Sequence, residues 1–511
     1  MLAFAVQGSK LVSTEGASGG GAPSVSGGYV IGKEDLPVPG MLTIDPAKGS
    51  LVCRKSIVGA AAIGLPVDCG SQGRLNLRTC LLPDRDKMYG LEQELARRRI
   101  MLLLNKLEEW SWSDLAANDP IMAGLDKARE QFTRGLVAGD EAERDRVAHE
   151  SLLTALDAGE QLAVREAERS LSRRLAAGDR PQFGVAVHAD QFAEPLQRVL
   201  QGAVDFVQVP MRWNRIEPDE GRYDFTKMDR WIEWAVRSGN VPVAAGPVVD
   251  LSPRGCPRWL HVWNHDYDTL REFAYEHTKR VVTRYRRTVN RWVVTGGINI
   301  NAGFTLSLEQ MVDLTRVCVM TARKLHPGAP VFVEISEPFG EHASRNNQSA
   351  APLLYAELVL GSGVQADGFA LRVQMGDASG GRGTRDLLEL SAMLDTFAEF
   401  DKPLVVSALG CPSAPAAGPA GTLPGINGAG GHWRGAWSNE TQVEWMNHAA
   451  LVCLSKPHVK SVCWQSLYDT ADGPEMPSGG LISADGRAKP ALKRLGEITQ
   501  GLRAGRVPTG R

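Results

Sequence analysis

The stretch Met211-Arg212-Trp213-Asn214-Arg215-Ile216-Glu217-Pro218 is the strongest indication of the architecture of this 511-residue chain. A short β-rich run, residues 206–210, precedes it. Gly221, Tyr223-Asp224-Phe225 and Asp229 follow it and open a helical pattern. A strand followed by a turn and a helix is the repeating unit of a parallel β/α fold.

The same alternation runs through the whole of residues 179–500. The β-rich runs in this region are residues 183–189, 206–210, 241–249, 291–295, 331–335, 368–373, 403–409 and 459–466. Eight strands with helical stretches between them, in about 300 residues, are the count and size of a (β/α)8 TIM barrel. The alternative is a doubly wound open sheet, but no Gly-x-Gly-x-x-Gly follows the first strand. We therefore predict an α/β fold whose main domain is a TIM barrel.

The chain ahead of the barrel divides into two parts. Residues 1–85 hold short apolar runs separated by Gly, Pro and Asp, which is typical of a β-rich, sandwich-like domain. Residues 86–178 switch to helical periodicity in two stretches, which predicts a helical hairpin packed on the barrel. An interaction surface for another subunit is the alternative for this segment, so it is the candidate contact of a homo-oligomer. Residues 501–511 form a C-terminal tail.

Two Gly-rich segments are expected to be loops. Residues 16–28 lack the Gly-Lys-Ser/Thr ending of a phosphate-binding loop, which argues against nucleotide binding. Residues 411–431 form a long segment after the seventh strand, and loops of this kind are often lids or binding loops, or are disordered.

Bulk composition argues against several partners. The formal net charge is −2, so no global basic field favours nucleic acid or an anionic membrane. No segment reaches about 18 uninterrupted apolar residues, and residues 1–13 do not resemble a signal peptide. The eight cysteines form no Cys-x-x-Cys pair and no His/Cys cluster with zinc spacing. We expect a cytoplasmic protein with no metal and no cofactor.

Five further motifs follow the opening stretch in chain order. They are Pro257-Arg258-Trp259-Leu260, the segment from Glu276-His277 to Arg291-Trp292, Asp367-Gly368-Phe369, Trp464 and Lys489-Pro490-Ala491. Together the six motifs resemble glycoside hydrolase family 10, the xylanases, over about 300 residues of barrel. The resemblance implies a carbohydrate or related small-molecule ligand. It also implies hydrolysis by two glutamates, one that protonates the leaving oxygen and one that attacks the sugar.

Neither glutamate stands at its family position. Alignment on Trp292 places the acid/base position, at the end of the fourth strand, on Gly297. The nucleophile position falls on Ala408, and residues 403–439 contain no acid at all. Because removing such a catalytic unit costs on the order of 10⁶ in rate, we predict that family-type hydrolysis is lost.

Polar and aromatic groups remain at the predicted strand ends, where barrel active sites lie. We place there Arg212, Asp250, Asn299, Asn301, Glu334, Glu337, Gln374, Asp377, Trp464 and Asp469. In the resemblance, Arg212 replaces the family's lysine and Gln374 replaces a histidine. With Asn299 and Trp464, they are the candidate substrate-binding residues, whereas we expect Trp213 to belong to the core.

Three interpretations of this mouth remain open. In the first, the barrel is a pseudo-enzyme that binds a saccharide or a related ligand without cleaving it. In the second, it is an active glycosidase with relocated carboxylates, for which Asp250, Glu334 and Glu337 are the candidates. In the third, it is a structural protein whose N-terminal parts mediate assembly.

Overall fold

A computed structural model shows the predicted barrel and describes residues 1–6, 14–15, 24–45, 48–192, 194–377, 381–415, 430–470 and 476–508. Most of both Gly-rich loops, residues 16–28 and 411–431, lies outside this range. The eight strand positions of the barrel are occupied by β11 (Gln182–Ala186), β12 (Val207–Val209), β13 (Val243–Ala245) with β14 (Val249–Asp250), β15 (Arg291–Gly296), β16 (Val331–Ile335), β17 (Gly368–Gln374), β18 (Leu404–Gly410) and β20 (Val459–Trp464). The TIM-barrel prediction is confirmed.

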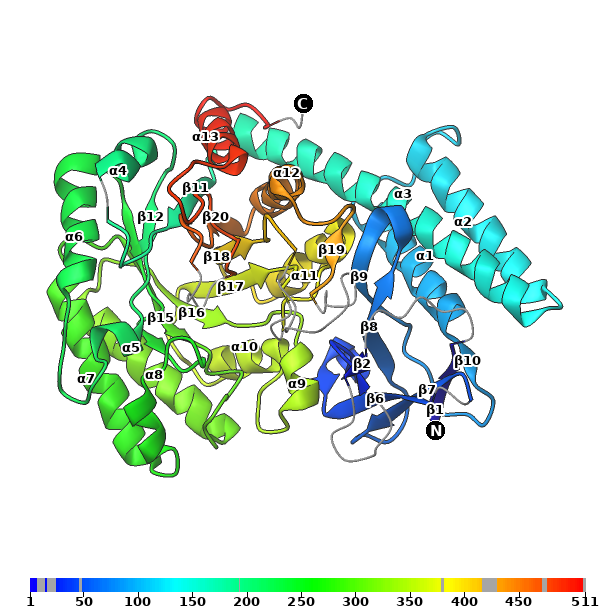
Figure 1. The fold of residues 1–511 in the computed structure, drawn as a ribbon, viewed down its shortest axis with the longest axis horizontal. Helices are drawn as coiled ribbons and strands as arrows, with labels where there is room; N and C mark the ends of the chain where they lie inside the picture. The colour runs from blue at the N-terminus through cyan, green and yellow to red at the C-terminus, as the bar shows by residue number, and fades with distance from the viewer. Residues whose placement is uncertain are drawn as a thin grey trace.

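The barrel is closed and all of its pairings are parallel. β11 pairs with β12 on one side and with β20 on the other, which joins the first strand to the last. β13 and β14 are two pieces of the third strand, and both pair with β15. Helices surround the sheet (Figure 1). They are α4 (Glu194–Leu200), α5 (Trp213–Ile216), α6 (Thr226–Trp234), α7 (Tyr267–Tyr285), α8 (Leu308–Leu325), α9 (Glu341–Arg345), α10 (Pro352–Gly361), α11 (Leu387–Ala398), α12 (Asn439–Ser455) and α13 (Pro490–Arg503).

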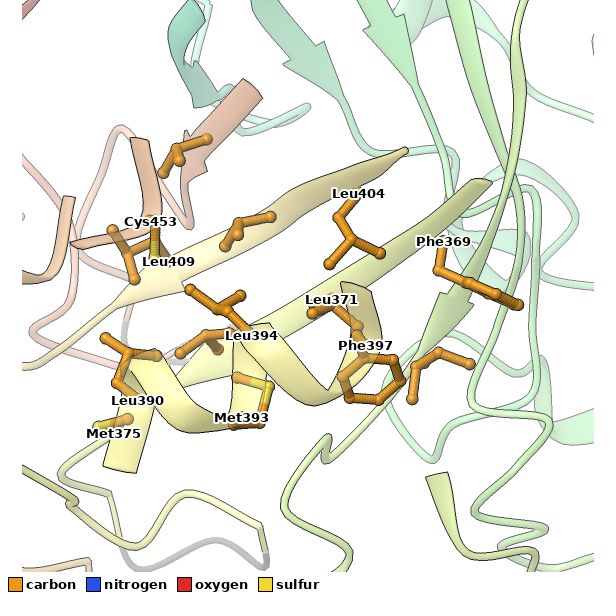
Figure 2. Packing of buried hydrophobic residues seen from close by; sticks show 14 of the residues in the cluster. Phe369, Leu371, Met375, Leu390, Met393, Leu394, Phe397, Leu404, Leu409 and Cys453 are labelled. Atoms are coloured by element: carbon orange, nitrogen blue, oxygen red, sulfur yellow. The ribbon is translucent and has the colours of Figure 1, made fainter. Parts of the chain in front are cut away.

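Alternate residues of each strand face opposite sides of the barrel wall. Phe369 and Leu371 of β17 pack outward against Leu394 and Phe397 of α11 (Figure 2). Ala370, between the first two, belongs instead to a separate cluster. That cluster, Val293, Phe332, Ala370 and Val405, fills one half of the barrel interior, and Ala186, Phe206, Ala244 and Cys463 form the matching cluster in the other half. Side chains two positions further along these strands therefore point into the barrel mouth.

The N-terminal part forms two antiparallel-rich sheets beside the barrel (Figure 1). Their strands are β1 (Leu2–Ala5), β2 (Thr14–Glu15), β3 (Ser24–Val25), β4 (Tyr29–Ile31), β5 (Pro37–Val38), β6 (Gly40–Asp45), β7 (Ser50–Lys55), β8 (Ala62–Asp68), β9 (Gly73–Arg78) and β10 (Tyr89–Gly90). One strand of the second sheet is β19 (His432–Trp433), which comes from the segment after β18 of the barrel and pairs with β9. The barrel thus contributes a strand to the N-terminal domain.

Three helices, not two, connect this domain to the barrel. They are α1 (Leu91–Glu109), α2 (Pro120–Val137) and α3 (Glu141–Ala176). The prediction of a hairpin missed α2, although Asp119 caps its first turn and Pro120 occupies its first position, which are standard start signals of a helix. α3 packs on α1 and α2 and also on α11 and α12 of the barrel. The helical segment is therefore packed against the barrel of its own chain.

Candidate functional site

Most of the opening motif builds scaffold, whereas Arg212 lines a cavity. Trp213 is fully buried and donates its indole N–H to Oε2 of Glu217 at 2.7 Å, while the other oxygen accepts from the Gly221 backbone N–H at 2.8 Å. His277 stacks on Trp213 with ring centroids 4.4 Å apart, and Trp259 donates to the Glu217 carbonyl at 3.0 Å. Burial opposes ionisation of Glu217, but its interactions with His277, Tyr223, Trp213 and the Gly221 N–H outweigh it and hold the pKa of its carboxyl below the usual range. The cluster fixes the turn between β12 and α6.

A cavity of about 340 Å³ opens at the carboxyl ends of the barrel strands. This is where barrel proteins bind their ligands, and the volume lies within the range of small-molecule pockets. Its lining residues are Ala186, Gln208, Pro210, Arg212, Gly246, Pro247, Asp250, Ser252, Pro253, Arg254, Ile300, Ala302, Glu334, Ser336, Glu337, Arg372, Gln374, Gly381, Arg382, Ser407, Ala408 and Gln465. Arg212, Gln374 and the three candidate carboxylates are therefore brought together in one place.

Glu334 lies at the floor of this cavity with both carboxylate oxygens occupied. Oε1 accepts from Nε of Arg372 at 3.2 Å and from the Ser336 hydroxyl at 3.1 Å. Oε2 accepts from Nη2 of Arg372 at 3.3 Å and from the Ser407 hydroxyl at 3.1 Å. The side chain is an ion-paired anchor that orients Arg372 toward the cavity.

The other two candidate carboxylates also have partners. Asp250 accepts from the Ser252 backbone N–H at 2.9 Å. Glu337 lies 3.6 Å from Nδ1 of His342 and 3.4 Å from Arg345. Burial opposes its ionisation, but His342 and the nearby arginines outweigh this and hold the pKa of Glu337 below its usual range. Glu337 is therefore an ionised carboxylate rather than a proton donor at neutral pH.

The two positions at which the resemblance places the glutamates differ in the side chains that the structure allows there. Ala408 lines the cavity on β18, so a longer side chain there would point into the mouth. Gly297 has φ +69°, and a Cβ added to it would lie 2.3 Å from the backbone nitrogen of Ser252. Backbone atoms cannot yield as a flexible side chain can, so this strand end has no room for a glutamate in its present path.

Two candidate binding residues prove to be structural. Trp464 has no exposed surface, donates its indole N–H to the Gly479 carbonyl at 2.9 Å and packs edge-on to Trp445, so it presents no face to a ligand. Asn299 is fully buried and bridges Ser336 in both directions, donating to its carbonyl at 2.8 Å and accepting from its N–H at 3.1 Å. The prediction that they bind substrate is corrected: both hold the chain behind the cavity wall.

Three further groups predicted at the mouth lie outside the cavity lining. Asn301 is buried and donates to the carbonyls of Leu306 and Gln348. Asp377 pairs with Arg382 at 2.7 Å.

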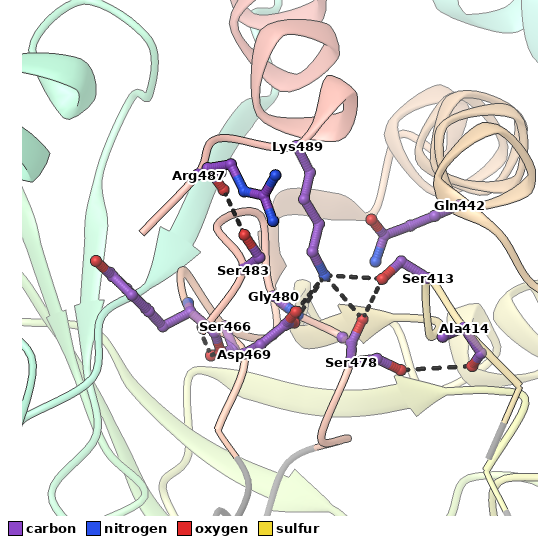
Figure 3. A network of polar contacts seen from close by, with 12 residues as sticks. Ser413, Ala414, Gln442, Ser466, Asp469, Ser478, Gly480, Ser483, Arg487 and Lys489 are labelled. Atoms are coloured by element: carbon purple, nitrogen blue, oxygen red, sulfur yellow. Dashed lines mark hydrogen bonds and ion pairs between the residues drawn. The ribbon is translucent and has the colours of Figure 1, made fainter. Parts of the chain in front are cut away.

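The third group, Asp469, belongs to a polar network beside the mouth (Figure 3). It pairs with Lys489 at 2.7 Å, and Lys489 also donates to the Ser413 hydroxyl at 2.8 Å and to the Ser478 carbonyl at 3.2 Å. This network ties the segments after β18 and β20 to the start of α13.

The N-terminal domain holds the barrel loops that carry one side of the cavity. Ser344 lies in the short helix α9 of the loop after β16, accepts from the Val30 N–H at 2.9 Å and donates to the Val38 carbonyl at 2.8 Å. Asn76 donates its backbone N–H to the Thr384 carbonyl, after β17, at 2.7 Å. Because Glu337 and Arg382 belong to these same two loops, the N-terminal domain helps to fix their positions.

Sequence reasoning missed several lining residues: Gln208, Arg254, Arg372, Arg382, Ser407 and Gln465. Strand alternation was a usable signal for some of them, because Arg372, Ser407 and Gln465 each stand two positions after an interior residue. Within the described part of the chain, no group of three or more His, Cys, Asp and Glu side chains is placed to hold a metal ion. None of the helices in that part is long and apolar enough to cross a membrane.

These features define a (β/α)8-barrel protein with a cavity at the carboxyl ends of its strands. The family model of glycosyl hydrolase family 10 matches residues 172–310, which run from the end of α3 to the beginning of α8. Residues 172–310 are therefore similar to this family.

Individual relatives are distant. Endo-1,4-beta-xylanase 2 from Aureobasidium pullulans is 23% identical over 215 residues, which is 40% of this chain and 58% of that enzyme. Xylanase 10B from Thermotoga maritima has 16% identity and a TM-score of 0.46, covering 67% of this chain and 99% of its own. Xylanase 10B from Thermotoga petrophila RKU-1, in complex with xylobiose, has 16% identity and a TM-score of 0.47, covering 64% and 96%. What these enzymes act on does not pass to this chain by likeness alone.

Proposed function

We propose that this barrel binds a saccharide or a related small ligand in the cavity at its C-terminal face, without cleaving it by the family's retaining mechanism. The observation that carries the proposal is the backbone at Gly297, where φ is +69° and an added Cβ would lie 2.3 Å from the Ser252 nitrogen. A retaining glycosidase needs two carboxyl groups roughly 5–5.5 Å apart. Gly297, the position at which the resemblance places one of them, has no space for a carboxyl side chain.

The carboxylates that remain in the cavity support the same proposal. Each oxygen of Glu334 already accepts two hydrogen bonds, so an attack on a sugar carbon would first have to break its contact with Arg372. His342, Arg345 and Arg254 hold the pKa of Glu337 below its usual range, which does not suit a general acid. The cavity itself is open and of ligand size.

Hydrolysis by relocated carboxylates is the second candidate function. The observation in its favour is that Asp250, Glu334 and Glu337 all line the same cavity. In that mechanism one of them protonates the leaving oxygen while another activates water or attacks the sugar.

The test pairs binding with turnover on the full-length protein. We expect xylotriose, or another oligosaccharide from a glycan array, to bind while xylan and aryl xylosides are not hydrolysed. Ala408→Phe, which fills the cavity, should abolish binding, whereas Ala177→Phe on the exposed surface should leave it unchanged. Turnover that Glu334→Gln abolishes would overturn the non-hydrolytic proposal, and binding that survives Ala408→Phe would overturn the assignment of the cavity.

A further inference from the structure

Arginine is the most frequent residue type among the described residues that line the cavity. Arg212 follows β12, Arg254 follows β14, Arg372 lies on β17 and Arg382 follows β17, so four guanidinium groups reach one cavity from three of the eight strand positions. Among the described residues that line it, none is Trp, Tyr, Phe or His. A neutral sugar ring is usually held against an aromatic face, and the described wall offers none.

We infer that the ligand of this cavity carries an oxyanion, first of all the carboxylate of an acidic sugar, which the arginines bind. This rests on the proposed function, since it names the chemical class of the ligand at the same site. The planar guanidinium fork matches a carboxylate or a phosphate with two parallel hydrogen bonds, and such charge-assisted bonds are about twice as strong as neutral ones.

Two of the four arginines are held in place before any ligand arrives. Glu334 fixes Arg372 through Nε at 3.2 Å and Nη2 at 3.3 Å, and Asp377 fixes Arg382 at 2.7 Å. A guanidinium has five N–H donors, so a carboxylate that orients it does not exhaust its capacity to bind. Side chains that are already ordered lose less entropy when the ligand binds.

Four arginines and three carboxylates line the cavity, so the formal charge of its lining is +1. Glu334 accepts hydrogen bonds from Arg372 and from two hydroxyls. Glu337 contacts His342 and Arg345, and neither of these two residues lines the cavity. Asp250 accepts from the Ser252 backbone N–H and, like Arg254, lines the cavity. Each acid thus has its own partner within the protein.

The experiment compares two probes that differ by one acidic group. Binding of xylotriose, and of xylotriose that carries a glucuronic acid, is measured by calorimetry on the full-length protein, with inorganic phosphate as a competitor. Arg212→Gln and Arg254→Gln are the test variants, because both residues are partly exposed and line the cavity. Arg222→Gln, whose side chain is 83% exposed, is the matched control, and thermal melting checks that each variant is folded.

The acidic probe should bind about tenfold more tightly than the neutral one, and the preference should shrink as salt is raised. Either test variant should remove most of the preference, while Arg222→Gln keeps it. Phosphate that displaces the acidic probe supports the oxyanion chemistry and identifies a phosphate ester as the alternative source. Equal binding of both probes overturns the inference and leaves the proposed function intact, whereas cleavage of a bound probe overturns only the non-hydrolytic proposal. Binding of neither probe overturns both.

Discussion

Adding a side chain at Gly297 should destabilise the barrel, for two reasons that the local geometry provides. The backbone there has φ +69°, a region that costs an L-residue roughly 1–2 kcal/mol. The new Cβ would also lie 2.3 Å from the Ser252 nitrogen and 2.9 Å from its Cα, which are backbone atoms that move only with their strand end. Overpacking of this kind typically costs about 1–3 kcal/mol. We therefore expect Gly297→Ala to lower the free energy of unfolding by roughly 2–5 kcal/mol.

A second glycine separates the two contributions. Gly202 has φ +80°, but nothing lies within 4 Å of a Cβ added to it. Gly202→Ala therefore carries only the conformational cost, and the difference between the two variants measures the clash at Ser252.

Thermal melting followed by circular dichroism provides the readout. At about 2 °C per kcal/mol for a large domain, Gly297→Ala should melt roughly 4–10 °C below the parent protein, and Gly202→Ala roughly 2–4 °C below it. Gly297→Glu should melt at least as early as Gly297→Ala and should gain no xylanase activity, even combined with Ala408→Glu. Melting of Gly297→Ala within 1 °C of Gly202→Ala would refute the clash, and with it the main argument against family-type chemistry.

Three further predictions concern the scaffold. Burial raises the pKa of Glu160 to about 7, above the ordinary value near 4.5, so the folded state loses up to about 3 kcal/mol of stability as pH rises from 4.5 through 7. The melting temperature of Glu160→Gln relative to wild type should therefore increase between pH 5 and pH 8. A difference that stays constant over this range would contradict the prediction. Glu217→Gln weakens the charge-assisted bonds from Trp213 and Gly221 and should cost about 1–3 kcal/mol in urea unfolding, whereas an unchanged midpoint would remove Glu217 from the scaffold. Ser344→Ala leaves the buried Val30 N–H without its acceptor and should cost about 1–3 kcal/mol, with faster hydrogen exchange in β4 as the measurement; protection equal to wild type would show that this contact does not hold the domain.

The barrel was predictable because each of its strands is a short buried run between helical stretches. Such a strand can be recognised from its local sequence alone, because a strand that is covered on both faces is apolar along its whole length. The joining of domains was less accessible. β19 comes from a segment after β18 and pairs with β9, more than 350 positions earlier in the chain, and no local pattern announces a pairing over that distance. The sequence therefore predicted the elements of the chain better than the contacts between its parts.

The error at Trp464 has its physical origin in the direction of side chains at a strand end. Cys463 of β20 faces the barrel interior, so its neighbour Trp464 must face the helices, and Gln465 returns to the cavity. Period-two alternation would have excluded Trp464 as a sugar platform and selected Gln465 in its place. The same rule selects Arg372 two positions after Ala370. The alternation rule does not predict the direction of Arg254 or Arg382, because both residues lie on loops after the strands. The loop of Arg382 is held by contacts with the N-terminal domain, and those contacts are a property of the folded chain as a whole.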